Sequence, residues 1–186
     1  MKSKDGINTG KFGVWLKQHL GDNSPYSVFY DHGNQQEDPS VAAIKGFYGY
    51  QVANKNRLAD IDVMVVDDSK NEVVLLIEIE ESEMPPKKLL GDVFAVLMCN
   101  KIAVKIETKQ RYFSVSPNTQ FVVAGMVSSR GAGRDKIKNT ITPRLQQFGV
   151  PNGAIQIDKI KFVFGEDVFE TIEELKIEVR SSFAAN

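Results

Sequence analysis

Four acidic residues lie inside or beside two strongly apolar stretches of this 186-residue chain. Asp60 and Asp62 precede the run VMVV, and Glu78 and Glu80 follow the run VVLLI. Burying a carboxylate costs several kcal/mol unless a cation or a hydrogen-bond donor meets it. Because side chains alternate along a strand, the two acids of each stretch share one face of it. If the stretches are neighbouring strands, the carboxylates converge at one end of a sheet, and at least one stays protonated unless a cation intervenes.

This acidic cluster predicts a hard divalent cation. Oxygen ligands favour Mg²⁺ or Ca²⁺, and bound Mg²⁺ lowers the pKa of a bound water and neutralises charge on a phosphate in the transition state. The alternative interpretation is that the acids mark solvated strand ends. That alternative accounts well for Asp67, Asp68, Glu81 and Glu83. It explains Asp62 and Glu78 poorly, because apolar residues follow the first and flank the second.

The elements that must position these acids are two strands, over about 57–66 and 73–80, joined by the turn DDSKN. The other expected elements are a helix over 11–20, a short strand over 26–30, a helix over 40–51, a helix over 85–104, strands over 111–117 and 119–129, a helix over 133–149, a strand over 155–164 and an acidic helix over 167–179. This order predicts a single α/β domain, 1–186, in which helices flank a central mixed sheet.

The sequence resembles the PD-(D/E)xK nuclease superfamily in this region. Asp62 precedes an apolar strand, and after a short turn a second apolar strand ends in Glu78-Ile79-Glu80. The order of elements over about 40–150 matches the core of that superfamily, so the resemblance implies a restriction-endonuclease-like sandwich. The position of the family's motif lysine holds Glu80, as in some restriction endonucleases that have Glu-x-Glu there. The chemistry implied is Mg²⁺-dependent hydrolysis of DNA phosphodiester bonds, with Mn²⁺ as a substitute, leaving a 5′-phosphate and a 3′-hydroxyl.

The resemblance also implies roles for individual residues. Asp62, Glu78 and the carbonyl of Ile79 are the expected metal ligands, and Asp60 is a second candidate for the aspartate role. Glu80 would orient or deprotonate the attacking water. A lysine of the next helix would replace the motif lysine; Lys87 and Lys88 are both candidates, and a solvated helix face is the alternative for either.

The size of the chain and the pattern ADID…IEIEES…PKK are similar to small cleavage subunits of heterodimeric type IIS restriction endonucleases. In that group a larger subunit recognises double-stranded DNA and nicks one strand, and the small subunit cuts the other. With this size and a formal net charge of −1, the chain has few residues left over for reading bases, so we expect weak or no sequence-specific binding without the partner. The acidic C-terminal helix or the aromatics of GFYGY would dock that partner. The alternatives are a stand-alone homodimeric repair or junction nuclease and a non-catalytic binding protein of the same fold.

Outside the acidic cluster, the glycine-rich segment 128–139 carries the best basic cluster: Arg130, Arg134, Lys136 and Lys138. Backbone N–H groups there would meet a DNA phosphate, and a flexible loop with ordinary surface charge is the alternative. Glu37 precedes the expected helix at 40–51, where the superfamily often has an additional acid, although the polar loop NQQED explains it equally. His32, in a polar loop near acids, is a possible ligand.

Composition excludes several other classes. One cysteine, Cys99, and two histidines permit neither a disulfide framework nor a zinc ligand set, and we expect Cys99 to lie in the core. The amino terminus lacks an apolar segment typical of a signal peptide, and no apolar run approaches the ~18 residues of a membrane span. We therefore expect a cytoplasmic protein with no membrane partner.

Overall fold

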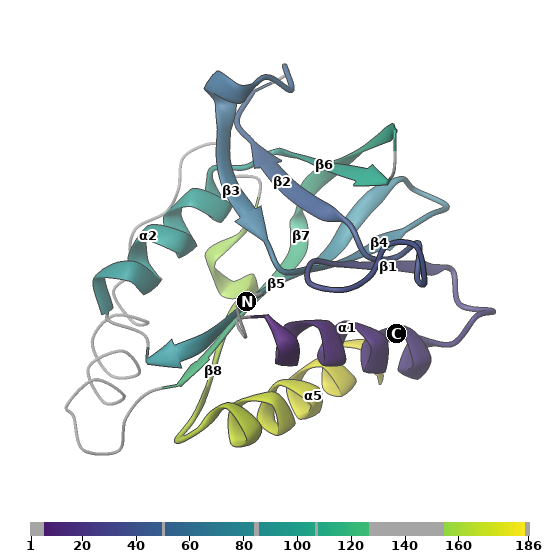
Figure 1. Ribbon diagram of the computed structural model, residues 1–186. Coiled ribbons are helices and arrows are strands. Elements are labelled where there is room, and N and C mark those ends of the chain that lie inside the picture. The colour runs from purple at the N-terminus through teal and green to yellow at the C-terminus, as the bar shows by residue number, and fades with distance from the viewer. Residues whose placement is uncertain (1–5, 50, 84–85, 107, 127–154, 185–186) are drawn as a thin grey trace.

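Eight strands of the chain form one mixed β-sheet (Figure 1). The computed structural model describes residues 6–49, 51–83, 86–106, 108–126 and 155–184. Within these ranges the elements are α1 (Ile7–Leu20), β1 (Tyr26–Tyr30), β2 (Ala43–Phe47), the short 3₁₀ helix η1 (Asn54–Asn56), β3 (Arg57–Ile61), β4 (Val63–Asp67), β5 (Glu72–Glu83), α2 (Pro86–Leu97), β6 (Lys101–Ile106), β7 (Lys109–Met126), the 3₁₀ helix η3 (Ile157–Lys159), β8 (Ile160–Gly165) and α5 (Val168–Ala184).

The strand order is β1-β4-β5-β7-β6-β2-β3, and β8 also pairs with β7. The pairs β5–β7 and β7–β8 are parallel and the other pairs are antiparallel. The long strand β7 joins the two halves, since its first part pairs with β6 and its later part with β5 and β8. The expectation of a mixed sheet flanked by helices is therefore confirmed.

Helices cover both faces of the sheet. Helices α1 and α5 lie side by side on one face (Figure 1), where Phe12 and Leu16 of α1 pack with Leu175 and Val179 of α5 against buried strand residues. Helix α2 covers the other face, and its buried Val93, Val96 and Leu97 join a core shared by both halves of the sheet. Strands β4 and β5, which carry the acidic cluster, therefore lie between two apolar layers.

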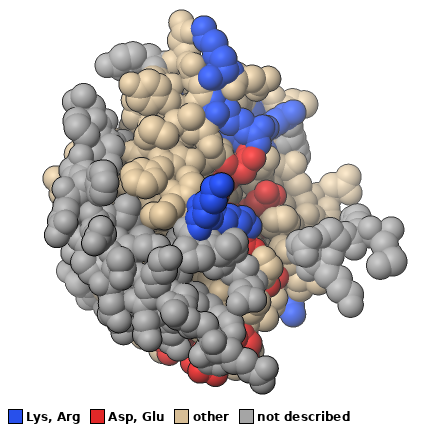
Figure 2. Space-filling view, turned by 90° about the vertical axis from the view of Figure 1, so that its left-hand side faces the viewer, with Lys and Arg blue, Asp and Glu red and all other residues tan. Residues whose placement is uncertain are grey.

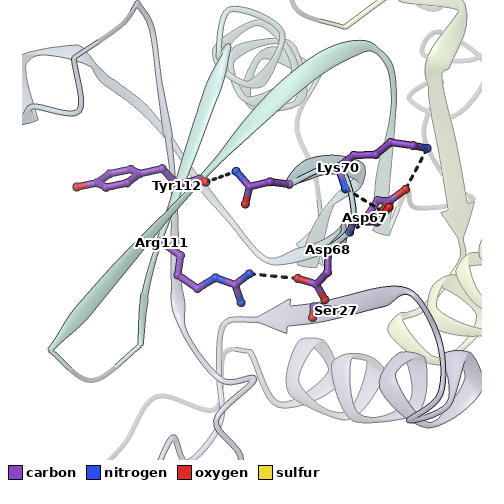
Figure 3. Close-up of polar contacts among 8 residues, drawn as sticks. Ser27, Asp67, Asp68, Lys70, Arg111 and Tyr112 are labelled. Atoms are coloured by element: carbon purple, nitrogen blue, oxygen red, sulfur yellow. Dashed lines mark hydrogen bonds and ion pairs between the residues drawn. The ribbon is translucent and has the colours of Figure 1, made fainter.

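The turn between β4 and β5 is held by side chains at the opposite end of these strands from the acidic cluster (Figure 3). Asp67 accepts hydrogen bonds from Ser69 and from the backbone N–H of Lys70, whose Nζ lies 3.0 Å from the Asp67 carboxylate. The hydrogen bonds from Ser69 and then from Lys70 lower the pKa of Asp67 to about 2. Asp68 pairs with Arg111 of β7 at 3.1 Å and with Ser27 of β1. These two acids belong to the turn. Asp68 is partly exposed, as the solvated-end alternative predicts, whereas Asp67 is buried and has its hydrogen bonds within the turn.

The hairpin prediction is confirmed, because β4 and β5 are antiparallel neighbours with Val63 opposite Ile77. The prediction of one continuous strand over 57–66 is wrong: the chain leaves the strand at Asp62, and β3 and β4 lie in different parts of the sheet. The backbone carbonyl of Asp62 instead accepts a hydrogen bond from the N–H of Asp31, at 2.8 Å. The break therefore results from a tertiary contact that local sequence does not reveal.

Three other predictions were wrong in part. Residues 43–47 form β2 rather than a helix, and Gly46 is required there because a Cβ atom would lie 2.5 Å from the sulfur of Cys99. The helix expected over 85–104 ends at Leu97, and residues 101–106 form β6. The strands expected at 111–117 and 119–129 are one strand, β7. The helix expected over 133–149 lies outside the described residues.

In the described part of the chain, none of the helices has the length and apolar character needed to cross a membrane. Cys99 is buried beneath β2, as expected for a core residue, and its Sγ–H donates to the carbonyl of Ala95 at 3.2 Å. Burial raises the pKa of the Cys99 thiol to about 12, with a further contribution from Glu78. The thiol is therefore a packing group rather than a nucleophile.

Candidate metal centre and hydrolytic site

A cavity of about 700 Å³ opens where β3, the start of β4, the end of β5 and α2 meet. Its lining includes all four acids of the two apolar stretches: Asp60, Asp62, Glu78 and Glu80. Figure 2 views the molecule from the side of α2 and shows carboxylates between basic side chains on this face. The tertiary structure thus brings the predicted acids together in one solvent-accessible hollow.

Asp62 and Glu78 form a hydrogen-bonded carboxyl pair in the floor of this cavity. The register explains the pair, because Val63 lies opposite Ile77 and the residues next to them therefore lie beside each other. Burial, followed by the neighbouring Asp62 carboxylate and then that of Asp92, raises the pKa of Glu78 well above its usual value. Burial also raises the pKa of Asp62. Because burial raises the pKa of both carboxyl groups, and that of Glu78 well above its usual value, the pair favours holding one proton between them.

The backbone of Ile79 completes this oxygen-rich floor. Its N–H donates to Oδ2 of Asp62 at 2.7 Å. The N–H and C=O of one strand residue point to the same edge of the strand, so the Ile79 carbonyl faces the side on which Asp62 lies. Ile79 also lines the cavity, together with Asp62 and Glu78.

Glu80 lies on the same face of β5 as Glu78, two residues further on. Its carboxylate forms an ion pair with Nζ of Lys88 and accepts hydrogen bonds from the N–H and hydroxyl of Ser82. The Lys88 side chain is 52% exposed, whereas that of Glu80 is 14% exposed, so the lysine is the outer member of the pair. Lys87 is exposed and does not line the cavity. Of the two candidate lysines, the structure therefore brings Lys88 to the acids and leaves Lys87 outside.

Asp60 occupies a different place from Asp62. Its side chain is 61% exposed and forms an ion pair with Arg57, three residues earlier on β3. Its effect on the pKa of Glu78 is smaller than those of Asp62 and Asp92. Asp60 therefore lies at the rim, and Asp62 is the aspartate that adjoins Glu78.

Two functional candidates in the cavity were missed or left open by sequence reasoning. Asp92 of α2 lines the cavity, and burial raises its pKa against the opposing effect of Lys88. The sequence feature that could have revealed Asp92 is its position four residues after Lys88, within an otherwise apolar stripe of the helix. His32 also lines the cavity; its backbone has the left-handed φ of 66°, and its ring packs against Gly6, where a Cβ atom would lie 2.2 Å away.

Glu81, which the sequence suggested was a solvated turn acid, holds the start of α1 instead. Its carboxylate accepts from the N–H of Thr9 at 2.7 Å, from the Thr9 hydroxyl at 2.9 Å and from Nδ2 of Asn8 at 2.9 Å. A carboxylate at a helix amino terminus also interacts favourably with the helix dipole. Glu37, by contrast, is exposed, bonds to Asn34 and does not line the cavity. The basic cluster of 128–139 lies outside the described residues.

The donor set suits a divalent cation of the magnesium type. Among the described residues, no group of three His, Cys, Asp or Glu side chains forms a ready-made ligand cluster. Mg²⁺ does not require one, since it is usually bound through one or two carboxylates and keeps several waters. Two adjoining carboxyl groups, of which one must hold a proton when no cation is near, together with a backbone carbonyl provide such a set.

Comparison with family models gives no match to this chain, and comparisons with curated proteins and with solved structures likewise give none.

Proposed function

We propose that the protein is a cytoplasmic Mg²⁺-dependent endonuclease subunit that hydrolyses phosphodiester bonds of double-stranded DNA. It would cut one strand beside a larger DNA-recognising subunit that nicks the other, as in type IIS restriction. The observation that carries the proposal is the Asp62–Glu78 carboxyl pair, with Glu80 and Lys88 at its side in an open cavity. The resemblance of Asp62 and Glu78-Ile79-Glu80 to the PD-(D/E)xK pattern supports the choice of substrate.

Asp62, Glu78 and the carbonyl of Ile79 would hold the cation. A bound Mg²⁺ supplies Lewis-acid stabilisation of the phosphate and a more acidic water. Glu78 must release its proton to act as a ligand, and the hydrogen bond to Asp62 holds that proton between the two groups in the metal-free protein. The N–H of Ile79 fixes the Asp62 carboxylate in place, so the pair is ordered before any substrate enters.

Glu80 and Lys88 supply the remaining chemistry. Glu80 is oriented by Ser82 and can accept a proton from an attacking water within the cavity. Lys88, bound to Glu80 in the free protein and half exposed, can turn to a phosphate oxygen that enters from solvent. A lysine on the following helix would thereby do the work of the lysine that the strand motif lacks.

Dependence on a partner is supported by charge and by exposed apolar residues. The formal net charge of −1 provides little general attraction for DNA. On the acidic helix α5, Phe169 is 73% exposed and Ile177 is 57% exposed. An acidic helix with exposed apolar side chains suits a protein surface better than a phosphate backbone.

Supercoiled plasmid with Mg²⁺ tests the proposal, with and without a candidate larger subunit. We expect cleavage only with both subunits, and Mn²⁺ should replace Mg²⁺. Glu78→Gln should abolish cutting of this subunit's strand and remove metal uptake in calorimetry. Glu37→Gln, at an exposed glutamate that does not line the cavity, is the matched control and should leave both unchanged. Cutting by the chain alone would favour a stand-alone nuclease, whereas metal binding without cutting under any condition would favour a binding protein.

A further inference from the structure

The hairpin β2–β3 carries more basic than acidic residues and adjoins the cavity. Between Asp38 and Asp60 the sequence has no acidic residue and three basic ones, Lys45, Lys55 and Arg57. Among the described residues, neither of these lysines takes part in an ion pair. For a chain whose formal charge is −1, this is a local concentration of positive charge that the hydrolytic site does not use.

An irregularity of the hairpin gathers its charges on one face. Lys45 is opposite Asp60 and Phe47 is opposite Arg57, so that Leu58 is an extra residue on β3. In a regular strand, residues three apart point to opposite faces. The extra residue places Arg57 on the face of Asp60 and Lys45, which permits the ion pair between Arg57 and Asp60.

This charged hairpin adjoins the hydrolytic cavity. Strand β3 is the last strand of the sheet, and its Leu58, Ala59 and Asp60 form part of the cavity wall. In Figure 1 the hairpin extends beyond the rest of the sheet, above α2. In Figure 2 basic side chains continue from the middle of this face to its upper edge. A polymer with its backbone along the hairpin would therefore pass beside the cavity that contains the carboxyl pair.

The connecting loop of the hairpin has the chemistry of a phosphate-contacting surface. Tyr48 is 61% exposed, and the loop also carries Asn54 and Lys55. The loop is braced internally, because Nδ2 of Asn56 donates to the carbonyl of Gln51 at 2.9 Å. Tyrosine, asparagine, lysine and arginine side chains are frequent donors to phosphate oxygens, and a braced loop loses less entropy on binding.

We propose that the β2–β3 hairpin clamps the sugar-phosphate backbone of duplex DNA beside the cleaved bond, with the Arg57–Asp60 ion pair as its gate. The inference rests on the proposed function and names where that substrate is held. In the free protein Asp60 occupies the Arg57 guanidinium. A backbone phosphate exchanges with Asp60, because guanidinium binds phosphate and carboxylate with the same forked geometry. Asp60 thus restrains binding where no phosphate is present and is not itself required to hold the metal.

Fluorescence anisotropy with a labelled duplex, in Ca²⁺ instead of Mg²⁺, measures this binding across a range of salt concentrations. The test variant is Lys55→Ala/Arg57→Ala. The control, Lys11→Ala/Lys161→Ala, removes the same charge from exposed positions on α1 and β8. Each lost phosphate contact should weaken binding about tenfold at ~50 mM salt and reduce the slope of log K against log salt by about 1. Arg57→Lys should recover most of the salt slope but only part of the affinity, and Asp60→Asn should tighten binding.

The outcomes separate the clamp from the function it rests on. The clamp is overturned if the test and control variants show the same DNA affinity and the same salt slope, provided that both are folded by circular dichroism and the wild type binds. The nuclease proposal would stand in that case. Failure of the wild-type protein alone to bind duplex at low salt overturns the clamp, whereas failure to bind in the presence of the larger subunit as well overturns the nuclease proposal. Weaker metal uptake by Asp60→Asn, instead of tighter DNA binding, would reassign Asp60 as a metal ligand and remove the gate.

Discussion

Replacing Glu78 by glutamine should stabilise the metal-free protein at neutral and alkaline pH. In the native state Glu78 holds its proton, because burial and the carboxylates of Asp62 and Asp92 disfavour its ionised form. Glutamine has nearly the same shape as a protonated glutamic acid, and its Nε2–H can make the same donation to Asp62. Glu78→Gln therefore mimics the protonated site at every pH.

The expected difference in unfolding free energy between the wild type and Glu78→Gln follows from the coupling of one proton to folding. Below the ordinary glutamate pKa of 4.5, Glu78 is protonated in both the folded and unfolded states, and the two proteins should be similarly stable. Above it, unfolded Glu78 loses its proton while folded Glu78 keeps it. The wild type should then lose about 1.4 kcal/mol of unfolding free energy per pH unit relative to Glu78→Gln, until the pH passes the raised native pKa.

Urea unfolding in EDTA at several pH values from mildly acidic to alkaline measures this difference. Glu174→Gln controls for the loss of a carboxylate from the surface. Adding Mg²⁺ provides a second arm: at a hundred times its Kd it should stabilise the wild type by about 2.7 kcal/mol and leave Glu78→Gln unchanged. Parallel pH curves for the wild type and Glu78→Gln would refute the protonated carboxyl pair, and with it the reason for expecting a cation there.

Three further predictions concern the surroundings of the pair. Lys88→Ala should reduce cleavage by ~10²-fold or more in the plasmid assay while Lys87→Ala has little effect, because only Lys88 reaches the acids; equal losses would contradict this assignment. Glu81→Ala should cost about 2 kcal/mol in urea unfolding, since it leaves Asn8 and Thr9 at the start of α1 without their acceptor, and Glu81→Gln should recover part of that loss. Gly6→Ala should cost more than about 1 kcal/mol in the same measurement, because φ is 86° and the added carbon would meet the His32 ring; an unchanged midpoint would show that the His32 ring moves freely.

Hydrophobic periodicity predicted the elements that bury one regular face of side chains in the core. The hairpin of β4 and β5, helix α1 and helix α5 follow from apolar spacing and turn residues alone. Residues 43–47 did not, since Gly46 has no apolar side chain to mark its buried position, and the remaining apolar residues also fit a helix. The requirement for glycine comes from Cys99, which lies far along the chain, so no local rule could supply it.

The carboxyl pair could be predicted, but its surroundings could not. Asp62 and Glu78 are conspicuous because apolar residues adjoin them. Asp92 and His32 come from segments whose approach to β5 depends on how α2 and the turn after β1 pack. A single aspartate in a helix stripe and a histidine in a polar loop usually have no functional role. Only their shared position in the cavity makes Asp92 and His32 functional candidates.

The break at Asp62 explains why two aspartates with similar neighbours in the sequence lie in different surroundings in the structure. On a continuous strand Asp60 and Asp62 would share a face, and both would compete for the same cation. The Asp62 carbonyl binds Asp31 and its carboxylate binds the N–H of Ile79, so this residue belongs to the β4–β5 pair. Asp60, two residues earlier, stays with the β2–β3 hairpin and with Arg57. The same spacing thus supplies one carboxylate to the hydrolytic centre and another to the surface beside it. It follows that Asp62→Asn should impair metal binding and cleavage together, whereas Asp60→Asn should act on DNA affinity.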